Sequence, residues 1–247
     1  MLIHHALPSA EITSGITMVD TSAVPWPGYT FGHTSEVDPD VVAQSYLELA
    51  HQLDVDRHAL VTATQVHGCS VIVVADSRPD PDARADALVT NRPQWILGVK
   101  LADCCGVLMW DKKNGAAAAV HSGWRGTAQN IVAATIVTMH REYGTNPNDL
   151  DVWLSPCASG ARYEVRDDVE QLLPSFCTPV EGGDQRWTFD NHAAIRHQLR
   201  TSGVPEDSII TDTACTIGDT RWQSHRRDGQ RAGRMLAFIG LRPMAGK

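Results

Sequence analysis

Cysteine and histidine side chains that could do chemistry lie close to predicted strands in this sequence. Cys104 and Cys105 lie in "LADCCGVLMWD", His121 lies in "VHSGWRG" and His67 lies in "TQVHG". His67, Cys104 and His121 each fall at the end of a predicted strand, where a side chain can point into a shared cleft. Three such ligands with an open fourth position are the pattern of a catalytic zinc site, in which bound water becomes acidic.

The same residues allow other interpretations. Their spacings match no local zinc-finger pattern, and a buried cysteine often packs as a small hydrophobic residue. A Cys-His pair could supply a nucleophile, but such a site also needs an oxyanion hole and an orienting Asn or Asp. A disulfide between Cys104 and Cys105 would be strained. Because the six cysteines form no CxxC pair, we expect reduced thiols.

The composition is typical of a globular protein with a full core. Of 247 residues, 43% are hydrophobic and 20% are charged, and no repeat or linker divides the chain. We therefore expect one domain over residues 1–247. The net charge of -8 argues against nucleic-acid binding but leaves small anions possible through a local arginine cluster. With no signal peptide or long apolar segment, the sequence predicts a cytoplasmic protein without membrane contact, and a monomer is favoured.

The pattern of apolar residues predicts a layered α+β fold. Asp38 and Pro39 begin a predicted helix that continues to residue 53. A second helix is predicted over 127–143, ending at Gly144, and is expected to be the longest. Further helices are predicted at 166–176 and 191–200. Short strands are predicted at 59–66, 70–76, 86–90, 95–102, 106–111, 115–122, 149–155, 208–214 and 234–241.

Several sequence blocks resemble those of the YfiH-type family. They occur in order from about Gln65 to Leu241 and read "TQVHG", "ADALVTN", "ADCCGVLMWD", "AAAAVHSGWRGTAQNIV", "SPCASGARYEV" and "WQSHRRDG" followed by "AGRM". This family is labelled multicopper polyphenol oxidase (laccase) and is also described as purine nucleoside phosphorylases with adenosine deaminase activity. The resemblance implies a layered α/β sandwich similar to the catalytic domain of cytotoxic necrotising factor.

The resemblance also implies the functional residues. It makes His67, Cys104 and His121 the metal ligands, and Cys105 a packed thiol beside them. Asp103 is expected to orient a ligand or the reacting water. Trp124 is expected to be mainly a core residue that could also stack on a base. The implied substrate-binding residues are Gln65, which could bond the substrate, and Arg125, Arg226 and Arg227, which could hold phosphate, with Arg227 preferred to Arg226.

The resemblance implies a zinc enzyme that cleaves adenosine, inosine and guanosine with inorganic phosphate and deaminates adenosine. A copper-dependent polyphenol oxidase is an alternative because His and Cys also suit copper. A laccase would need HxH pairs, and none of the 11 histidines forms one. A binding or editing factor for cell-wall precursors is a third possibility.

The N-terminal region departs from the family pattern. The family has an arginine- and glycine-rich block where residues 16–39 read "ITMVDTSAVPWPGYTFGHTSEVDP". If the missing arginine contacts phosphate or ribose, phosphorolysis is the activity that would be weakened. His225 also stands where the family has an aromatic hydroxyl.

Overall fold

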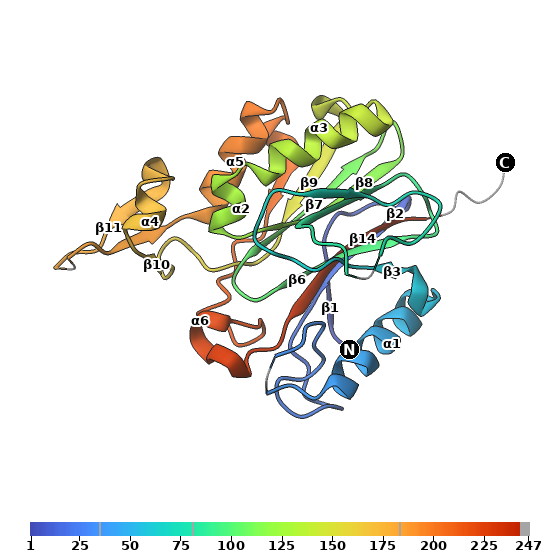
Figure 1. Ribbon diagram of the computed structural model, residues 1–247, viewed down its shortest axis with the longest axis horizontal. Helices are drawn as coiled ribbons and strands as arrows, with labels where there is room; N and C mark the ends of the chain where they lie inside the picture. The colour runs from blue at the N-terminus through green and yellow to red at the C-terminus, as the bar shows by residue number, and fades with distance from the viewer. Residues whose placement is uncertain (35, 81, 183, 243–247) are drawn as a thin grey trace.

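Two large sheets dominate the computed structural model, which describes residues 1–34, 36–80, 82–182 and 184–242 (Figure 1). The six-stranded sheet has the order β13 (Ile209–Thr211), β9 (Leu150–Leu154), β7 (Cys105–Asp111), β8 (Ala116–Ser122), β5 (Ala87–Thr90) and β4 (Val71–Val73). The five-stranded sheet has the order β1 (Ile3–His5), β2 (Ile12–Thr17), β14 (Met235–Leu241), β6 (Ile96–Leu101) and β3 (Leu60–Val61). A small third sheet contains β10 (Glu164–Val165), β12 (Trp187–Phe189) and β11 (Cys177–Pro179).

The two large sheets pack against each other, and helices cover their outer faces. Leu108 of β7 and Ala237 of β14 belong to the core between the sheets. Val107 and Met109 belong to the opposite core, under α3 (Ile131–Tyr143) and α5 (Asn191–Thr201). Strands buried on both faces read as continuous apolar runs, which explains the sequences of β7 and β8. The predicted layered α+β sandwich is confirmed.

Helix α1 (Pro39–Leu53) covers the outer face of the five-stranded sheet. The side chain of Asp38 accepts a hydrogen bond from the backbone N–H of Asp40, which confirms the predicted N-cap. At 15 residues, α1 is longer than the 13-residue α3, so the expectation for 127–143 was wrong. That segment is divided because Asn130 has a left-handed backbone (φ 60°), which separates α2 (Trp124–Ala128) from α3.

Other predicted elements are shorter than expected. The segment 59–66 pairs only at β3 and at one isolated bridge, Thr64 to Arg84, before it continues into the loop that carries His67. The predicted helix at 166–176 shrinks to α4 (Asp167–Glu170) and a 3-10 turn at Pro174, a residue that disfavours helix before it. The six cysteines are free thiols. Within the described ranges, no helix is long and apolar enough to cross a bilayer.

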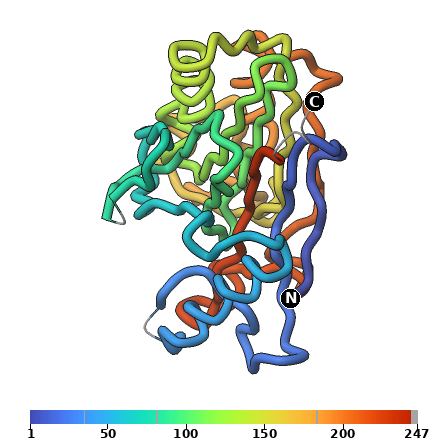
Figure 2. Tube along the Cα trace, turned by 90° about the vertical axis from the view of Figure 1, so that its right-hand side faces the viewer, coloured from blue at the N-terminus to red at the C-terminus, as the bar shows by residue number. Residues whose placement is uncertain are grey.

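The two ends of the chain share one sheet. Strand β14 lies between β2 and β6, and Figure 2 shows the N-terminal strands beside it. The loops at one end of these strands also pair, because Thr30 Oγ1 accepts from the backbone N–H of Arg234 at 2.7 Å. Segments near both termini therefore meet beside the β6–β7 turn that carries Cys104.

Candidate metal centre

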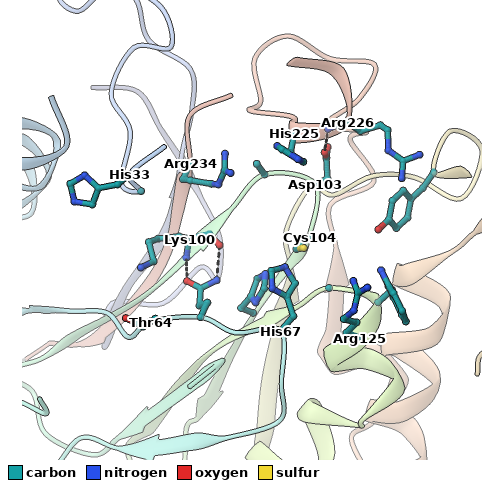
Figure 3. Close-up of a pocket in the computed structure, with 17 residues that line it drawn as sticks. His33, Thr64, His67, Lys100, Asp103, Cys104, Arg125, His225, Arg226 and Arg234 are labelled. Atoms are coloured by element: carbon teal, nitrogen blue, oxygen red, sulfur yellow. Dashed lines mark hydrogen bonds between the residues drawn. The ribbon is translucent and has the colours of Figure 1, made fainter. Parts of the chain in front are cut away.

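The structure brings His67, Cys104 and His121 together (Figure 3). One donor atom from each lies within 4.8 Å of the other two. His121 lies near the end of β8, Cys104 directly precedes β7, and His67 lies in the loop after β3. His121 is buried, whereas His67 is exposed, so the cluster is closed on one side and open on the other.

A fully buried carboxylate, Asp86, positions two of these three residues. Its Oδ1 atom lies 2.8 Å from His121 Nδ1. The same carboxylate accepts hydrogen bonds from the backbone N–H groups of His67, at 2.9 Å, and Gly68, at 2.8 Å. These bonds support the left-handed backbone of His67 (φ 59°). With Nδ1 engaged, Nε2 of His121 is the nitrogen available to a metal.

The charges in the cluster stabilise one another. Burial would raise the pKa of Cys104, but His121 and His67 outweigh it and lower that pKa to about 6. Burial would lower the pKa of His121, but the Cys104 thiolate and Asp86 raise it to about 9. Burial would also raise the pKa of Asp86, yet its bonds to His121 and Gly68 lower it. These shifts all favour the charged forms, a thiolate at Cys104, an imidazolium at His121 and a carboxylate at Asp86.

Two imidazoles and one thiolate fit zinc, and they also suit copper. The space around them is shaped for the ligands: a Cβ atom at Gly123 would lie 2.7 Å from Cys104 Sγ and 3.3 Å from His67 Cδ2. Any larger residue there would displace a ligand. Both the donor set and the surrounding space therefore fit a single ion with one open coordination direction.

Replacing Asp86 with asparagine should lower zinc affinity by roughly 10- to 100-fold, the usual effect of losing a carboxylate that orients a ligating histidine. Chelator competition would measure it. Asp111→Asn is the matched control, because Asp111 is also a fully buried carboxylate but bonds to Asn114 and Lys113 at the far end of β7. Equal affinity loss in both variants would mean that general destabilisation, and not ligand positioning, is responsible.

The cluster opens into a pocket of about 510 Å³ with many cationic groups. Asp103 is its one lining carboxylate among the described residues. Tyr163 and Trp124 give it aromatic surface, and Arg125 stacks on Trp124 with its guanidinium carbon 4.0 Å from the ring centroid. The basic lining residues are His33, His67, Lys100, His121, Arg125, His225, Arg226 and Arg234. The pocket therefore suits a flat ligand that carries negative charge, although the protein as a whole has a net negative charge.

Comparison with known proteins gives the family. Residues 17–242 match the family described as multi-copper polyphenol oxidoreductase laccase. The chain belongs to this family. It is 36% identical over 224 residues to a Mycobacterium tuberculosis protein named purine nucleoside phosphorylase, covering 89% of this chain and 87% of that one. A Corynebacterium glutamicum protein of the same name is 34% identical over 226 residues, covering 89% of each.

Solved structures of the family have the same fold. YlmD from Geobacillus stearothermophilus superposes with a TM-score of 0.88 at 27% identity, covering 97% of each chain. YfiH from Bacillus licheniformis gives 0.86 at 28% identity, covering 94% of this chain and 93% of that one. The predicted YfiH-type resemblance is confirmed.

In this family member, Asp103 and Arg226 are linked across the pocket. The Asp103 carboxylate accepts from Thr216 Oγ1 at 2.7 Å and from the backbone N–H of Arg226 at 2.6 Å. Asp103 therefore anchors the loop carrying α6 (His225–Asp228), a different role from the expected orientation of a ligand or water. The Arg226 guanidinium lines the pocket, donates to the Glu164 carbonyl at 2.7 Å and lies 5.1 Å from the Tyr163 ring centroid.

The geometry favours Arg226 over Arg227, contrary to the expected preference, and which arginine holds phosphate stays a prediction. Arg227 is absent from the pocket lining, and its guanidinium donates to the carbonyls of Thr216 and Trp222 and to Asp228. Through these bonds the Arg227 side chain stabilises the loop to which it belongs. Gln65 lines the pocket, but its amide is engaged, because it accepts from Lys100 N at 2.7 Å and donates to Lys100 O at 2.8 Å.

The remaining predicted residues line the pocket, pack in the core, or do both. Trp124 is half-buried and does both, because it packs on the cluster around Val169 and also lines the pocket. Cys105 is fully buried, as expected of a packed thiol, but it faces the helix side of the sheet. There it forms a second group of soft donors with Cys157 and His192, whose Sγ and Nε2 atoms are 3.3 Å apart. Sequence reasoning missed both this group and Asp86.

Proposed function

We propose that this protein is a zinc-dependent purine nucleoside phosphorylase that also deaminates adenosine. The observation that carries the proposal is the convergence of His67, Cys104 and His121 at the side of a cationic pocket with aromatic walls. The names of the relatives in Mycobacterium and Corynebacterium support the phosphorylase part. Adenosine, inosine and guanosine are the proposed nucleosides, and inorganic phosphate is the second substrate.

Different side chains would bind the zinc ion and the substrate. His67, Cys104 and His121 would bind zinc, which when bound supplies a Lewis acid and lowers the pKa of water. Asp86 keeps the His121 ring oriented. Trp124 and Tyr163 each have a guanidinium over the ring, and these stacked groups line the pocket in which a purine base would lie.

Phosphorolysis requires a phosphate anion to be held next to the ribose of the nucleoside. A phosphate oxygen forms a bond to the ribose anomeric carbon as the bond to the purine nitrogen breaks, and the departing base takes up a proton. Arg226 and Arg125 are exposed guanidinium groups on one wall of the pocket and can neutralise phosphate through paired hydrogen bonds. Deamination needs water and not phosphate: water adds at C6 of adenosine and ammonia leaves, giving inosine.

A phosphate-dependence assay separates these reactions. The purified protein is incubated with adenosine, inosine or guanosine, with and without phosphate, and base is separated from nucleoside. Base should appear only with phosphate, whereas adenosine should yield inosine in its absence. Base release without phosphate would contradict phosphorolysis. Tight binding of an amino-acid-bearing cell-wall nucleotide with no turnover of adenosine would instead favour the binding or editing role.

Protein made without added metal should contain about one zinc ion per chain, because one group of three ligands opens into the pocket. Elemental analysis measures this, and zinc content should fall at acid pH as the ligands become protonated. Several copper atoms per chain with no zinc would contradict the proposal and favour the phenol oxidase.

The free thiols fit a reducing compartment, so we place the enzyme in the cytoplasm.

A further inference from the structure

The pocket beside His67, Cys104 and His121 is here called the metal pocket. A second, smaller pocket adjoins it on the side opposite Arg226. It has a volume of about 240 Å³ and shares Gly32, His33 and Lys100 with the metal pocket. Figure 3 shows His33 and Lys100 on one side of the ligand cluster and Arg226 on the other. We call the smaller space the cation pocket, after its lining residues Arg57, Arg78 and Lys100.

The cation pocket holds two guanidinium groups and one ammonium group, and no carboxylate stands among its described lining residues. In the described part of the chain, none of the three groups forms an ion pair. Burial lowers the pKa of Arg57, and repulsion from Arg78 lowers it further. Burial also lowers the pKa of Lys100. Partly desolvated like charges held together are unfavourable until an anion joins them.

Neighbouring groups hold these side chains and the adjoining backbone in place. The Arg57 guanidinium carbon lies 4.1 Å from the centroid of the Tyr46 ring, and the Tyr46 hydroxyl donates to the Phe31 carbonyl at 3.2 Å. Arg78 donates to the backbone carbonyls of His58, at 3.3 Å, and Leu60, at 3.2 Å. Because the two arginines are already held in place, less entropy is lost when they bind an anion.

The wall between the two pockets depends on a glycine. A Cβ atom at Gly32 would lie 2.6 Å from Arg234 Cγ and 3.8 Å from Lys100 Cδ. Glycine thus lets Arg234, which lines the metal pocket, pack beside Lys100, which lines both. The two spaces therefore adjoin along Gly32, His33 and Lys100, and cationic side chains line both of them.

We propose that the cation pocket is a subsite for a phosphate group, supplied either by a purine 5′-nucleotide whose nucleoside part lies in the metal pocket or by inorganic phosphate. Its volume is below the roughly 300–1,000 Å³ of pockets that take whole small molecules, which favours a single small group. Two arginines and a lysine match the charge and geometry of a phosphate. The placement of the nucleoside rests on the proposed function, whereas the phosphate subsite does not.

Calorimetric titration of the zinc-loaded protein with inosine, IMP and inorganic phosphate tests the subsite, because the proposed enzyme does not convert inosine when phosphate is absent. A nucleotide subsite predicts that IMP binds about 10- to 100-fold more tightly than inosine, as expected for one or more charge-assisted hydrogen bonds. Arg57→Gln, which changes a residue that lines the cation pocket but not the metal pocket, should remove this advantage while leaving inosine binding unchanged. An inorganic-phosphate subsite predicts equal binding of IMP and inosine, with phosphate binding alone weakened by Arg57→Gln.

Arg141→Gln is the matched control, because it removes the same charge from an exposed arginine that pairs with Glu142 outside both pockets. Unchanged inosine binding and zinc content would show that the Arg57 variant is folded. Lys100→Met provides a second variant, judged by its zinc content and its binding of IMP and phosphate because Lys100 lines both pockets. The inference is overturned if neither variant changes IMP or phosphate binding relative to the control. If Arg57→Gln loses the preference for IMP while the wild-type protein never releases base, the proposed function is refuted and the subsite stands.

Discussion

Replacing His121 with alanine should abolish base release and adenosine deamination together. In the proposed function the two reactions use different attacking groups but depend on the same open metal site, in which His121 would be the buried ligand. A bound metal typically stabilises the transition state by several kcal/mol. At tenfold per 1.36 kcal/mol, its loss should lower kcat/KM by about 1,000-fold or more. Steady-state kinetics and elemental analysis on the same preparation measure activity and zinc content.

His51→Ala is the control for this variant, because His51 is an exposed histidine in the last turn of α1 and does not line the metal pocket. It should keep full activity and zinc. A His121→Ala protein that loses zinc yet deaminates adenosine normally would show that deamination does not need the metal. If zinc remains and both reactions stop, His121 acts on the substrate directly.

Sequence patterns drew attention to His67, Cys104 and His121 as candidate ligands because they flank apolar strand segments, and the family resemblance implied their role, but neither could locate Asp86. Its place depends on the pairing of β5 with β8, in which Ala87 lies opposite Val120. This antiparallel register sets Asp86 beside His121, and the backbone N–H of His121 donates to the Asp86 carbonyl at 2.7 Å. Pairing register between strands separated by two other elements cannot be read from local periodicity.

The helix predicted over 127–143 failed for a related reason. Its apolar period continues through the break, so periodicity alone indicates one helix. The break at Asn130 lets α2 turn toward the pocket with Arg125 while α3 packs on the sheet. Strands β7 and β8 were predicted well because burial on both faces requires continuous apolar residues, a signal that depends little on tertiary partners.

Adjacent arginines pose the hardest problem for sequence reasoning. Successive residues of a helix point about 100° apart, so Arg226 and Arg227 cannot both face the pocket. Which one does so depends on how α6 is docked. Ser224 caps it by accepting from the Arg227 backbone N–H, and Asp103 accepts from that of Arg226. These contacts turn the Arg226 side chain toward Tyr163 and the Arg227 side chain into its own loop.

This arrangement predicts different kinetics for the two arginines. Arg226→Ala should raise KM for phosphate by roughly 10- to 100-fold, the effect of losing a charge-assisted hydrogen-bond donor, while adenosine deamination stays nearly unchanged because water needs no guanidinium. Arg227→Ala should lower both reactions together and reduce thermal stability, because the carbonyls of Thr216 and Trp222 lose their donor. Initial rates at varied phosphate, with deamination measured in parallel, give both results.

Arg226→Lys adds a further test, since it keeps the charge and loses the planar fork. It should recover only part of the phosphate affinity. Equal losses in both reactions for Arg226→Ala would mean that its bond to the Glu164 carbonyl supports the loop and that phosphate binds elsewhere. If phosphate KM instead rises only in Lys100→Met, the attacking phosphate comes from the cation pocket, on the opposite side of the metal ligands from Arg226.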